Sequence, residues 1–361
     1  TLPKGTTTER IATSSGISTV IGAIRYNTDS NKMECYVNNK WMIVSTSSPN
    51  LDGGARGVFF FGFQNSYPSQ EPKVIDYITI STQGNAIDFG DMSGAVTFYG
   101  GVMGASNTRA IYAGGYRATG SPNYASNEMQ FVTFSSTGNS QDFGDLTDTI
   151  TYNPSGVSNN TRAIRCGGAT TPTTSINILD YVTIASTGNA NDFGDMTRER
   201  RFATASNTPV RGFVSGGSDG GTKFSDSELI TIASTGNSVT FGDVGDEQQN
   251  SNNGVICSST RAIMGGGSVP SHQKTIKKFE MISLGSHQEF GDLSAIRLYM
   301  AGCSNPVRGV FCGGNAQPSP AYLNIIEYIN ISTGGDAVDF GDRTEQGSYN
   351  TGVSNAHGGL G

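Results

Sequence analysis

The chain has 361 residues, including 49 glycines; 15% of its residues are charged, 35% are hydrophobic, and its formal net charge is −7. A glycine-rich chain with few strong helix formers favours β structure over helices. The acidic balance, with no basic run longer than the Arg-Glu-Arg-Arg of 198–201, argues against nucleic acid as a partner. No stretch approaches the roughly 20 apolar residues that a membrane span needs.

The cysteine and histidine content leaves little room for metal or acid–base chemistry. The five cysteines are widely spaced and form no Cys-x-x-Cys pair, which predicts buried free thiols rather than disulfides or a zinc site. Only three histidines are present. The first ten residues lack the apolar core of a signal peptide. We therefore expect no metal and no cofactor.

Residues 1–50 are predicted to form an extended arm followed by three short strands. The strand segments read GAIRYNT (22–28), KMECYV (32–37) and KWMIV (40–44). Three strands of this length form a meander that is marginal alone and requires a partner surface.

This segment resembles one found in bacteriophage structural and tail-fibre proteins, in which LPxGTTxERP precedes GxIRYNTDxxxxExYxxxxW. The matching residues are Leu2-Pro3, Gly5-Thr6-Thr7, Glu9-Arg10, Ile24 to Asp29, Glu34, Tyr36 and Trp41, while Ile11 replaces the expected proline. The resemblance implies a virion component that docks on other virion proteins, or forms homo-oligomers, through residues 1–50. It assigns attachment to Arg25, Tyr26, Tyr36 and Trp41.

The rest of the chain, residues 51–361, is a repeat. The tetrapeptide DFGD occurs four times, with TFGD and EFGD as variants, at spacings of 48–54 residues. Its phenylalanines are Phe89, Phe143, Phe193, Phe241, Phe290 and Phe340. A second marker, of the form TRAIYAGG, supplies Arg56, Arg109, Arg162, Arg211, Arg261 and Arg308. The letters DFG also occur in protein kinases, which use one such aspartate together with a catalytic loop that is absent here. Because the segment recurs six times, we exclude a kinase signature.

Each copy predicts four short antiparallel strands, which in the second copy are 99–107, 109–115, 129–136 and 139–146. Six such copies predict a six-bladed β-propeller. The first copy lacks its first strand, and 348–359 matches that strand, so we expect a C-terminal strand to complete the N-terminal blade and close the ring. The double glycines make 51–361 resemble a kelch propeller, although the only tryptophan lies outside the repeats.

The repeated residues are predicted to be structural. The DFGD phenylalanines should pack between neighbouring blades, with calcium binding by the aspartates as the alternative. The repeated arginines should pair with acids of the third strands, namely Asp76, Asp180, Glu228, Glu280 and Glu327, or with the DFGD aspartates; an anion-binding arginine ring is the alternative.

The loops between the second and third strands differ in every copy and should emerge on one face. Rigidly held Tyr, Ser and Asn residues suit recognition, so these loops are predicted to contact a host-surface glycan or protein. The candidate residues are Tyr67, Tyr116, Arg117, Tyr124, His272 and Tyr322. A purely architectural virion role and a polysaccharide-degrading enzyme remain alternatives. No catalytic set is recognisable, so enzyme activity is not expected.

Overall fold

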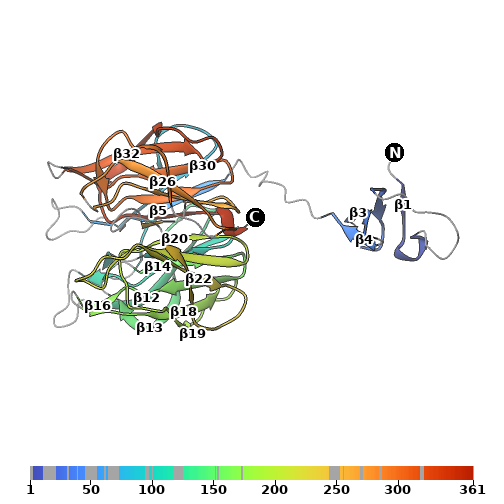
Figure 1. Cartoon of the computed structure of the whole chain (residues 1–361), viewed down its shortest axis with the longest axis horizontal. Coiled ribbons are helices and arrows are strands. Elements are labelled where there is room, and N and C mark those ends of the chain that lie inside the picture. Colours follow the sequence, from blue (N-terminus) through green and yellow to red (C-terminus); the bar gives the residue numbers. More distant parts are fainter. Residues whose placement is uncertain are drawn as a thin grey trace. The chain divides into compact units, whose positions relative to one another are not determined.

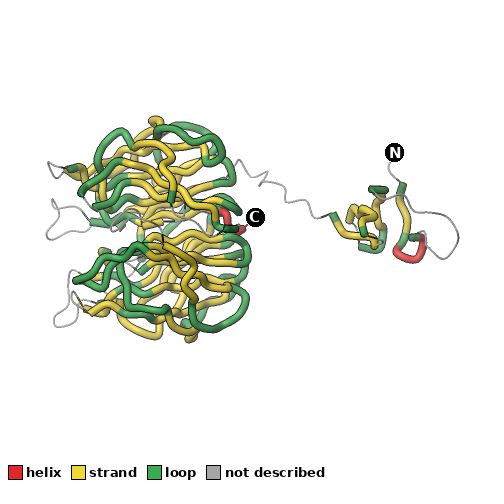
Figure 2. The backbone as a smooth tube through the Cα atoms, in the orientation of Figure 1, coloured by secondary structure: helices red, strands yellow, loops and turns green. Residues whose placement is uncertain are grey.

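The computed structural model describes residues 3–10, 22–30, 32–38, 40–44, 55–60, 62–63, 73–93, 97–99, 101–117, 125–150, 152, 154–171, 174–243, 253–254, 256–268, 271–283, 287–317 and 321–360. The chain divides into two compact units, Thr1–Pro49 and Asn50–Gly361. Both consist mainly of strands (Figure 1). The only helices among the described residues are the 3₁₀ turns η1 (Thr7–Glu9) and η3 (Gly358–Leu360), drawn red in Figure 2. The predicted all-β class is confirmed.

The first unit is a four-stranded sheet in the order β1-β2-β3-β4. Its strands are β1 (Lys4–Gly5), β2 (Ile24–Asn27), β3 (Lys32–Val37) and β4 (Lys40–Ile43). The last three are the predicted meander, while β1 adds a short parallel strand beside β2. Alternation along the strands buries Arg25 and Glu34 on one face and leaves Ile24 and Met42 exposed on the other.

The second unit consists of antiparallel sheets that follow the repeat. Sheet 2 contains β9 (Gly101–Ala105), β10 (Arg109–Ala113), β12 (Ser126–Thr133) and β13 (Gln141–Ile150). Sheet 3 contains β14 (Ser155–Ser158), β15 (Arg162–Cys166), β18 (Ile178–Thr183) and β19 (Asn191–Asp195). Sheet 4 contains β20 (Thr204–Asn207), β21 (Arg211–Ser215), β22 (Asp226–Thr231) and β23 (Val239–Asp243).

The remaining sheets vary this plan. Sheet 5 pairs β25 (Arg261–Gly265), β26 (Thr275–Glu280) and β27 (Gln288–Asp292). Sheet 6 contains β29 (Ala301–Ser304), β30 (Arg308–Cys312), β32 (Ala321–Asn330) and β33 (Val338–Gly347). Two pairs of short strands form separate two-stranded sheets, β8 (Thr97–Phe98) with β11 (Tyr116–Arg117) and β16 (Ala169–Thr171) with β17 (Thr174–Ser175). The short strands β28 (Arg297–Leu298) and β31 (Asn315–Ala316) extend sheet 6.

Sheet 1 combines strands from distant parts of the chain. It contains β5 (Arg56–Phe60), β6 (Val74–Thr79), β7 (Ile87–Asp91) and β34 (Thr351–Ser354), and β24 (Asn253–Gly254) lies parallel to β34. β34 pairs antiparallel with β5 in a register that places Thr351 opposite Phe60 and Ser354 opposite Gly57. The C-terminal strand that was predicted to pair with the first copy is therefore present as β34.

The core is divided into hydrophobic clusters that lie between neighbouring sheets. One cluster joins Phe60 and Ile75 of sheet 1 to Tyr112 and Val132 of sheet 2. Another joins Phe59 of sheet 1 to residues of sheet 6. Each cluster contains one FGD phenylalanine, partly buried in the case of Phe241 and buried in the others. Stability is thus built from several small cores, one at each sheet-to-sheet contact.

The FGD segment lies where one sheet meets the next. The carbonyl of Phe143 accepts a hydrogen bond from the amide of Gly188 at 2.7 Å, and the same bond recurs at the carbonyls of Phe89, Phe193, Phe290 and Phe340. The glycine that follows has a left-handed φ, +139° at Gly144, and a Cβ there would lie 2.4 Å from the Gly188 carbonyl oxygen. Only glycine allows this approach.

We therefore expect Gly144→Ala to destabilise the second unit by about 2 kcal/mol or more, because it adds a backbone clash to left-handed strain. Gly188→Ala is the matched control. Gly188 also has a left-handed φ, +154°, but a Cβ there meets nothing within 4 Å, so it should cost only about 1 kcal/mol. Urea unfolding followed by circular dichroism measures both. Equal losses would contradict the clash.

The predicted pairing of the repeat arginines with third-strand acids is wrong except in one copy. Arg56 lies opposite Thr79 in the ladder, whereas Asp76 lies three residues away and projects from the other face. Arg109 instead donates to the carbonyls of Ile184 (3.2 Å) and Ala185 (3.1 Å) in the next sheet. Arg56, Arg162, Arg261 and Arg308 make similar backbone contacts. Arg211 is exposed. Only Arg261 also pairs with its acid, Glu280, which lies directly opposite.

Candidate ligand-binding site

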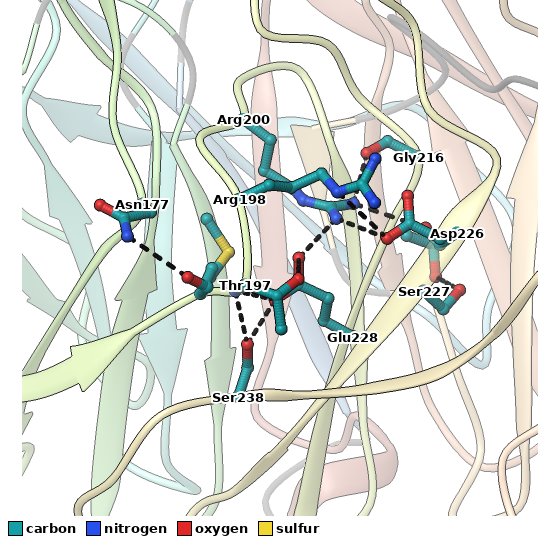
Figure 3. Close-up of polar contacts among 11 residues, drawn as sticks. Asn177, Thr197, Arg198, Arg200, Gly216, Asp226, Ser227, Glu228 and Ser238 are labelled. Carbon is teal, nitrogen blue, oxygen red and sulfur yellow. Dashed lines mark hydrogen bonds and ion pairs between the residues drawn. The ribbon is translucent and has the colours of Figure 1, made fainter.

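Buried ion pairs anchor the segments that lead into the first strands of the sheets. Figure 3 shows Arg200 beside Asp226 and Glu228 of β22, with Nη2 at 3.0 Å from Asp226 Oδ2 and 2.5 Å from Glu228 Oε1. Its Nη1 donates to the Gly216 carbonyl at 2.8 Å. The Thr197 hydroxyl donates to Glu228 at 2.8 Å. This network joins the end of sheet 3 to sheet 4.

Arg297 occupies the equivalent place in sheet 6. It is fully buried, pairs with Glu327 and donates to the Gly313 carbonyl at 3.1 Å. Both arginines stand two residues before an aromatic side chain, Phe202 after Arg200 and Tyr299 after Arg297. Because the guanidinium is held by a buried acid and a backbone carbonyl, it fixes the position of the aromatic residue that follows.

The aromatic residues at this position form a closed series of contacts. Each stands two or three residues before the first strand of its sheet and is partly buried. We call Tyr99, Tyr152, Phe202, Tyr299 and Tyr349 the aromatic circle. The centroid distances between neighbours are 5.1 Å for Tyr99–Tyr152, 6.4 Å for Tyr152–Phe202, 6.4 Å for Phe202–Tyr299, 3.8 Å for Tyr299–Tyr349 and 4.4 Å for Tyr349–Tyr99.

Four members of the aromatic circle have a strained backbone. Tyr99, Phe202, Tyr299 and Tyr349 have φ between +55° and +58°. Among the described non-glycine residues, only Asn38 shares a positive φ. A bulky residue in this region costs about 1–3 kcal/mol, and such strain is concentrated at functional sites. The recurrence of one costly conformation at four equivalent positions indicates that it serves to aim these rings.

The hydroxyls of the aromatic circle lie in an apolar setting. Burial raises the pKa of Tyr99, and the groups whose charge adds to this pKa shift are Tyr152, Tyr322, Tyr299 and Tyr116. Burial also raises the pKa of Tyr349. A cation lies at one side, where the Arg201 guanidinium is 5.6 Å from the centroid of Phe202. The site therefore combines aromatic faces with neutral hydroxyls.

Two of the residues predicted to contact a receptor lie beside the aromatic circle. Tyr116 is 6.4 Å from Tyr152, and Tyr322 contacts Phe63 at 6.1 Å, which in turn stacks on Tyr99 at 5.8 Å. His272 is exposed, and none of these ring contacts involves it. Tyr67 and Tyr124 lie outside the described residues, as does the side chain of Arg117.

The aromatic circle itself was missed in the sequence, although a signal exists. Its members recur at spacings close to the repeat length, with no aromatic residue in the corresponding segment 244–252 of the fifth copy. Tyr152 and Tyr349 are both followed by Asn and a Gly-Val-Ser-Asn segment, but the residues that flank Tyr99, Phe202 and Tyr299 differ, so the position is not part of a motif shared by all copies. The more regular GG and FGD markers led the prediction to the structural framework instead.

The opposite ends of the first strands are covered by the segment around His357. The His357 side chain is buried, and its ring nitrogens lie 3.2 Å from the Ala105 carbonyl, 3.4 Å from Ser158 Oγ and 3.0 Å from Asn207 Nδ2. The Gly358 amide donates to the Cys257 carbonyl at 3.1 Å. This segment thus ties together sheets 2, 3 and 4 and the start of the fifth copy, at the far end of the strands from the aromatic circle.

Three of the four predicted attachment residues form the interior of the first unit. Arg25 donates to the Thr6 carbonyl at 2.8 Å and lies 5.7 Å from the Trp41 ring, and Trp41 contacts Tyr36 at 5.4 Å. Tyr26 lies on the other face, which also carries Ile24 and Met42. Arg25, Tyr36 and Trp41 therefore hold the fold of this unit.

Neither a metal site nor a membrane helix is found in the described part of the chain. Its His, Cys, Asp and Glu residues form no group of three or more that could hold a metal ion. Its cysteines are free thiols, as predicted. None of its helices is long and apolar enough to cross a membrane.

Comparison with known proteins supports the fold. No family model matches the chain, and no curated protein matches its sequence. The structure is similar to the solved structure of YjhT, a β-propeller-like kelch protein, with a TM-score of 0.60 and 11% identity over 76% of this chain and 95% of that one. At this identity the likeness concerns the fold alone. The resemblance of residues 1–50 to bacteriophage proteins has no counterpart in these comparisons.

Proposed function

We propose that the protein is a bacteriophage virion protein whose second unit binds a host-surface glycan or protein through the face that carries the aromatic circle. The observation that carries this proposal is the aromatic circle itself, with four rings held at a left-handed φ beside Tyr116 and Tyr322. Strained aromatic residues on a rigid scaffold suit recognition, because little conformational freedom is lost on binding.

The proposal includes a closed six-bladed propeller as the scaffold. Its support is the pairing of β34 with β5 and the contacts of each first strand with the next, in the order β9, β14, β20, β24, β29, β34 and back to β9. In a closed ring every blade packs between two neighbours, so side chains from separate blades would be held at fixed distances.

The proposal places attachment to the particle in residues 1–50. The sequence resemblance of this segment to phage structural proteins supports it. The face with Tyr26, Ile24 (44% exposed) and Met42 (54% exposed) is a suitable contact surface, since large apolar side chains on a small sheet favour a protein partner.

Binding of the purified, labelled full-length protein to a panel of bacterial strains tests the proposal. We expect saturable attachment to susceptible strains, and Tyr116→Ala should weaken it several-fold because Tyr116 borders the aromatic circle. Val210→Ala is the control, because this side chain is 57% exposed and follows β20, at the other end of that strand from the aromatic circle. Absence of attachment to any strain would favour a purely architectural virion role. Release of soluble fragments from surface polysaccharide would point to an enzyme.

A further inference from the structure

The inference concerns the ligand of the aromatic circle, and it rests on the proposed function. Eight aromatic side chains contact one another here: the aromatic circle together with Phe63, Tyr116 and Tyr322. Their rings meet at angles from 23° to 90°, so they present several faces and edges and not one continuous stack.

Tyr99 is the centre of this group. It contacts Phe63, Tyr152 and Tyr349, at angles of 23°, 34° and 90°. Two further rings contact its neighbours: Tyr116 lies 6.4 Å from Tyr152, and Tyr322 lies 6.1 Å from Phe63. A ligand that reaches Tyr99 can therefore extend over either Tyr116 or the Phe63–Tyr322 pair.

The charge of the side chains around Tyr99 indicates whether the ligand is anionic, cationic or uncharged. The rings in contact with Tyr99 are those of Phe63, Tyr152 and Tyr349, and phenylalanine and tyrosine side chains carry no charge at physiological pH. One cation, Arg201, has its guanidinium 5.6 Å from the centroid of the Phe202 ring. A strongly anionic ligand would need several cations and a cationic ligand would prefer nearby carboxylates, whereas an uncharged ligand needs neither.

We propose that the aromatic circle binds an uncharged oligosaccharide, with one pyranose seated at Tyr99 and further units over the outer aromatic residues. The C–H groups on one face of a pyranose pack on an aromatic face, whose quadrupole is negative, and the tyrosine hydroxyls can hydrogen-bond to the sugar. Several separated aromatic faces fit a chain of sugars better than a single sugar, so affinity should rise with chain length.

Calorimetric titration of the full chain with neutral hexose and N-acetylhexosamine oligosaccharides of increasing length tests the proposal. We expect binding that strengthens from monosaccharide to tetrasaccharide and changes less than twofold between 50 and about 500 mM salt, because no charge is neutralised. Loss of affinity at high salt, or binding confined to sialylated or uronic-acid glycans, would overturn it. So would binding of choline chloride in place of the sugars, which would make the site a cation cage.

The decisive variant is Tyr99→Asn. Asparagine tolerates a left-handed φ, so the backbone at +55° is kept while the aromatic face is removed. Affinity should fall at least tenfold, and an unchanged circular dichroism spectrum would show that the variant is folded. Tyr26→Ala, a partly exposed tyrosine of the first unit, should leave affinity unchanged.

The same variant separates this inference from the proposed function. Attachment of Tyr99→Asn to cells at wild-type strength would overturn the sugar site while leaving receptor binding intact. Failure of the wild-type protein to attach to any strain would instead count against the proposed function.

Discussion

Arg297→Met is expected to destabilise the second unit by about 3–5 kcal/mol. The Arg297 side chain is fully buried, and Glu327, its partner, is 2% exposed. Removal of the guanidinium leaves the Glu327 carboxylate buried with a backbone amide, that of Ser294 at 3.1 Å, as its remaining described partner. A buried charge without a counter-ion costs more than the lost pair contributed, because it has been taken out of water without compensation.

The double variant Arg297→Met with Glu327→Gln distinguishes this cause from a loss of packing. Glutamine keeps an oxygen for the Ser294 amide but carries no charge, so the double variant should recover about 2 kcal/mol of the loss. Lys274→Met is the surface control. It removes the Lys274–Asp292 pair, whose lysine side chain is 51% exposed, and should cost less than about 1 kcal/mol. Urea unfolding followed by circular dichroism compares them; equal stability of both arginine variants would contradict the buried-charge argument.

The buried ion pairs also show where prediction from the sequence reaches its limit. The acids Asp76, Asp180, Glu228 and Glu327 recur at one place in the third strand and were recognised as a set. Their arginine partners do not share one position in the repeat. Arg165 lies in a second strand, Arg200 and Arg297 precede first strands, and Arg343 follows FGD. Because the same buried carboxylate is neutralised from three different chain positions, no spacing in the sequence could identify the partners.

The repeated strands and the FGD segments could be predicted, because their contacts occur at the same position in successive copies. In five copies the carbonyl of the FGD phenylalanine and the glycine that follows it meet the same backbone in the next sheet, so the constraint recurs and the letters recur with it. The four-strand pattern and the pairing partner of the first copy follow from counting copies. The aromatic circle follows from no such rule, since four of its five members share a backbone conformation while most of their neighbours in sequence differ.

His357 makes the stability of the second unit depend on pH. Burial lowers the pKa of His357 to about 4. Its Nδ1 lies 3.2 Å from the Gly359 amide and 3.0 Å from Asn207 Nδ2, and both of these groups are donors, so this nitrogen accepts and carries no proton. The other titratable group packed against this segment is Cys257, whose pKa burial raises to about 11, so it is also neutral near pH 7. Protonation of His357 would turn Nδ1 into a donor. It would then face two other donors, the Gly359 amide and Asn207 Nδ2, in a buried setting.

The sign of the pH dependence follows from these values. In the unfolded chain the pKa of histidine is about 6.5, so between pH 6.5 and pH 4 the unfolded chain binds a proton that the native protein does not. The native state is therefore fully stabilised above about pH 6.5 and loses stability as the pH falls toward 4. This contribution amounts to about 3 kcal/mol over the whole window.

Comparison of wild type with His357→Gln isolates this contribution from that of the carboxylates, which titrate in both proteins. The wild type should lose about 2–3 kcal/mol more than the variant between pH 7.5 and pH 4.5, because only the wild type has a buried group that must be protonated. His272→Gln, at an exposed position, should follow the wild type throughout. Parallel pH profiles for wild type and His357→Gln would show that the segment over the strand ends does not exclude water. In that case His357 could not act as the neutral acceptor that joins Gly359 to the strand β20.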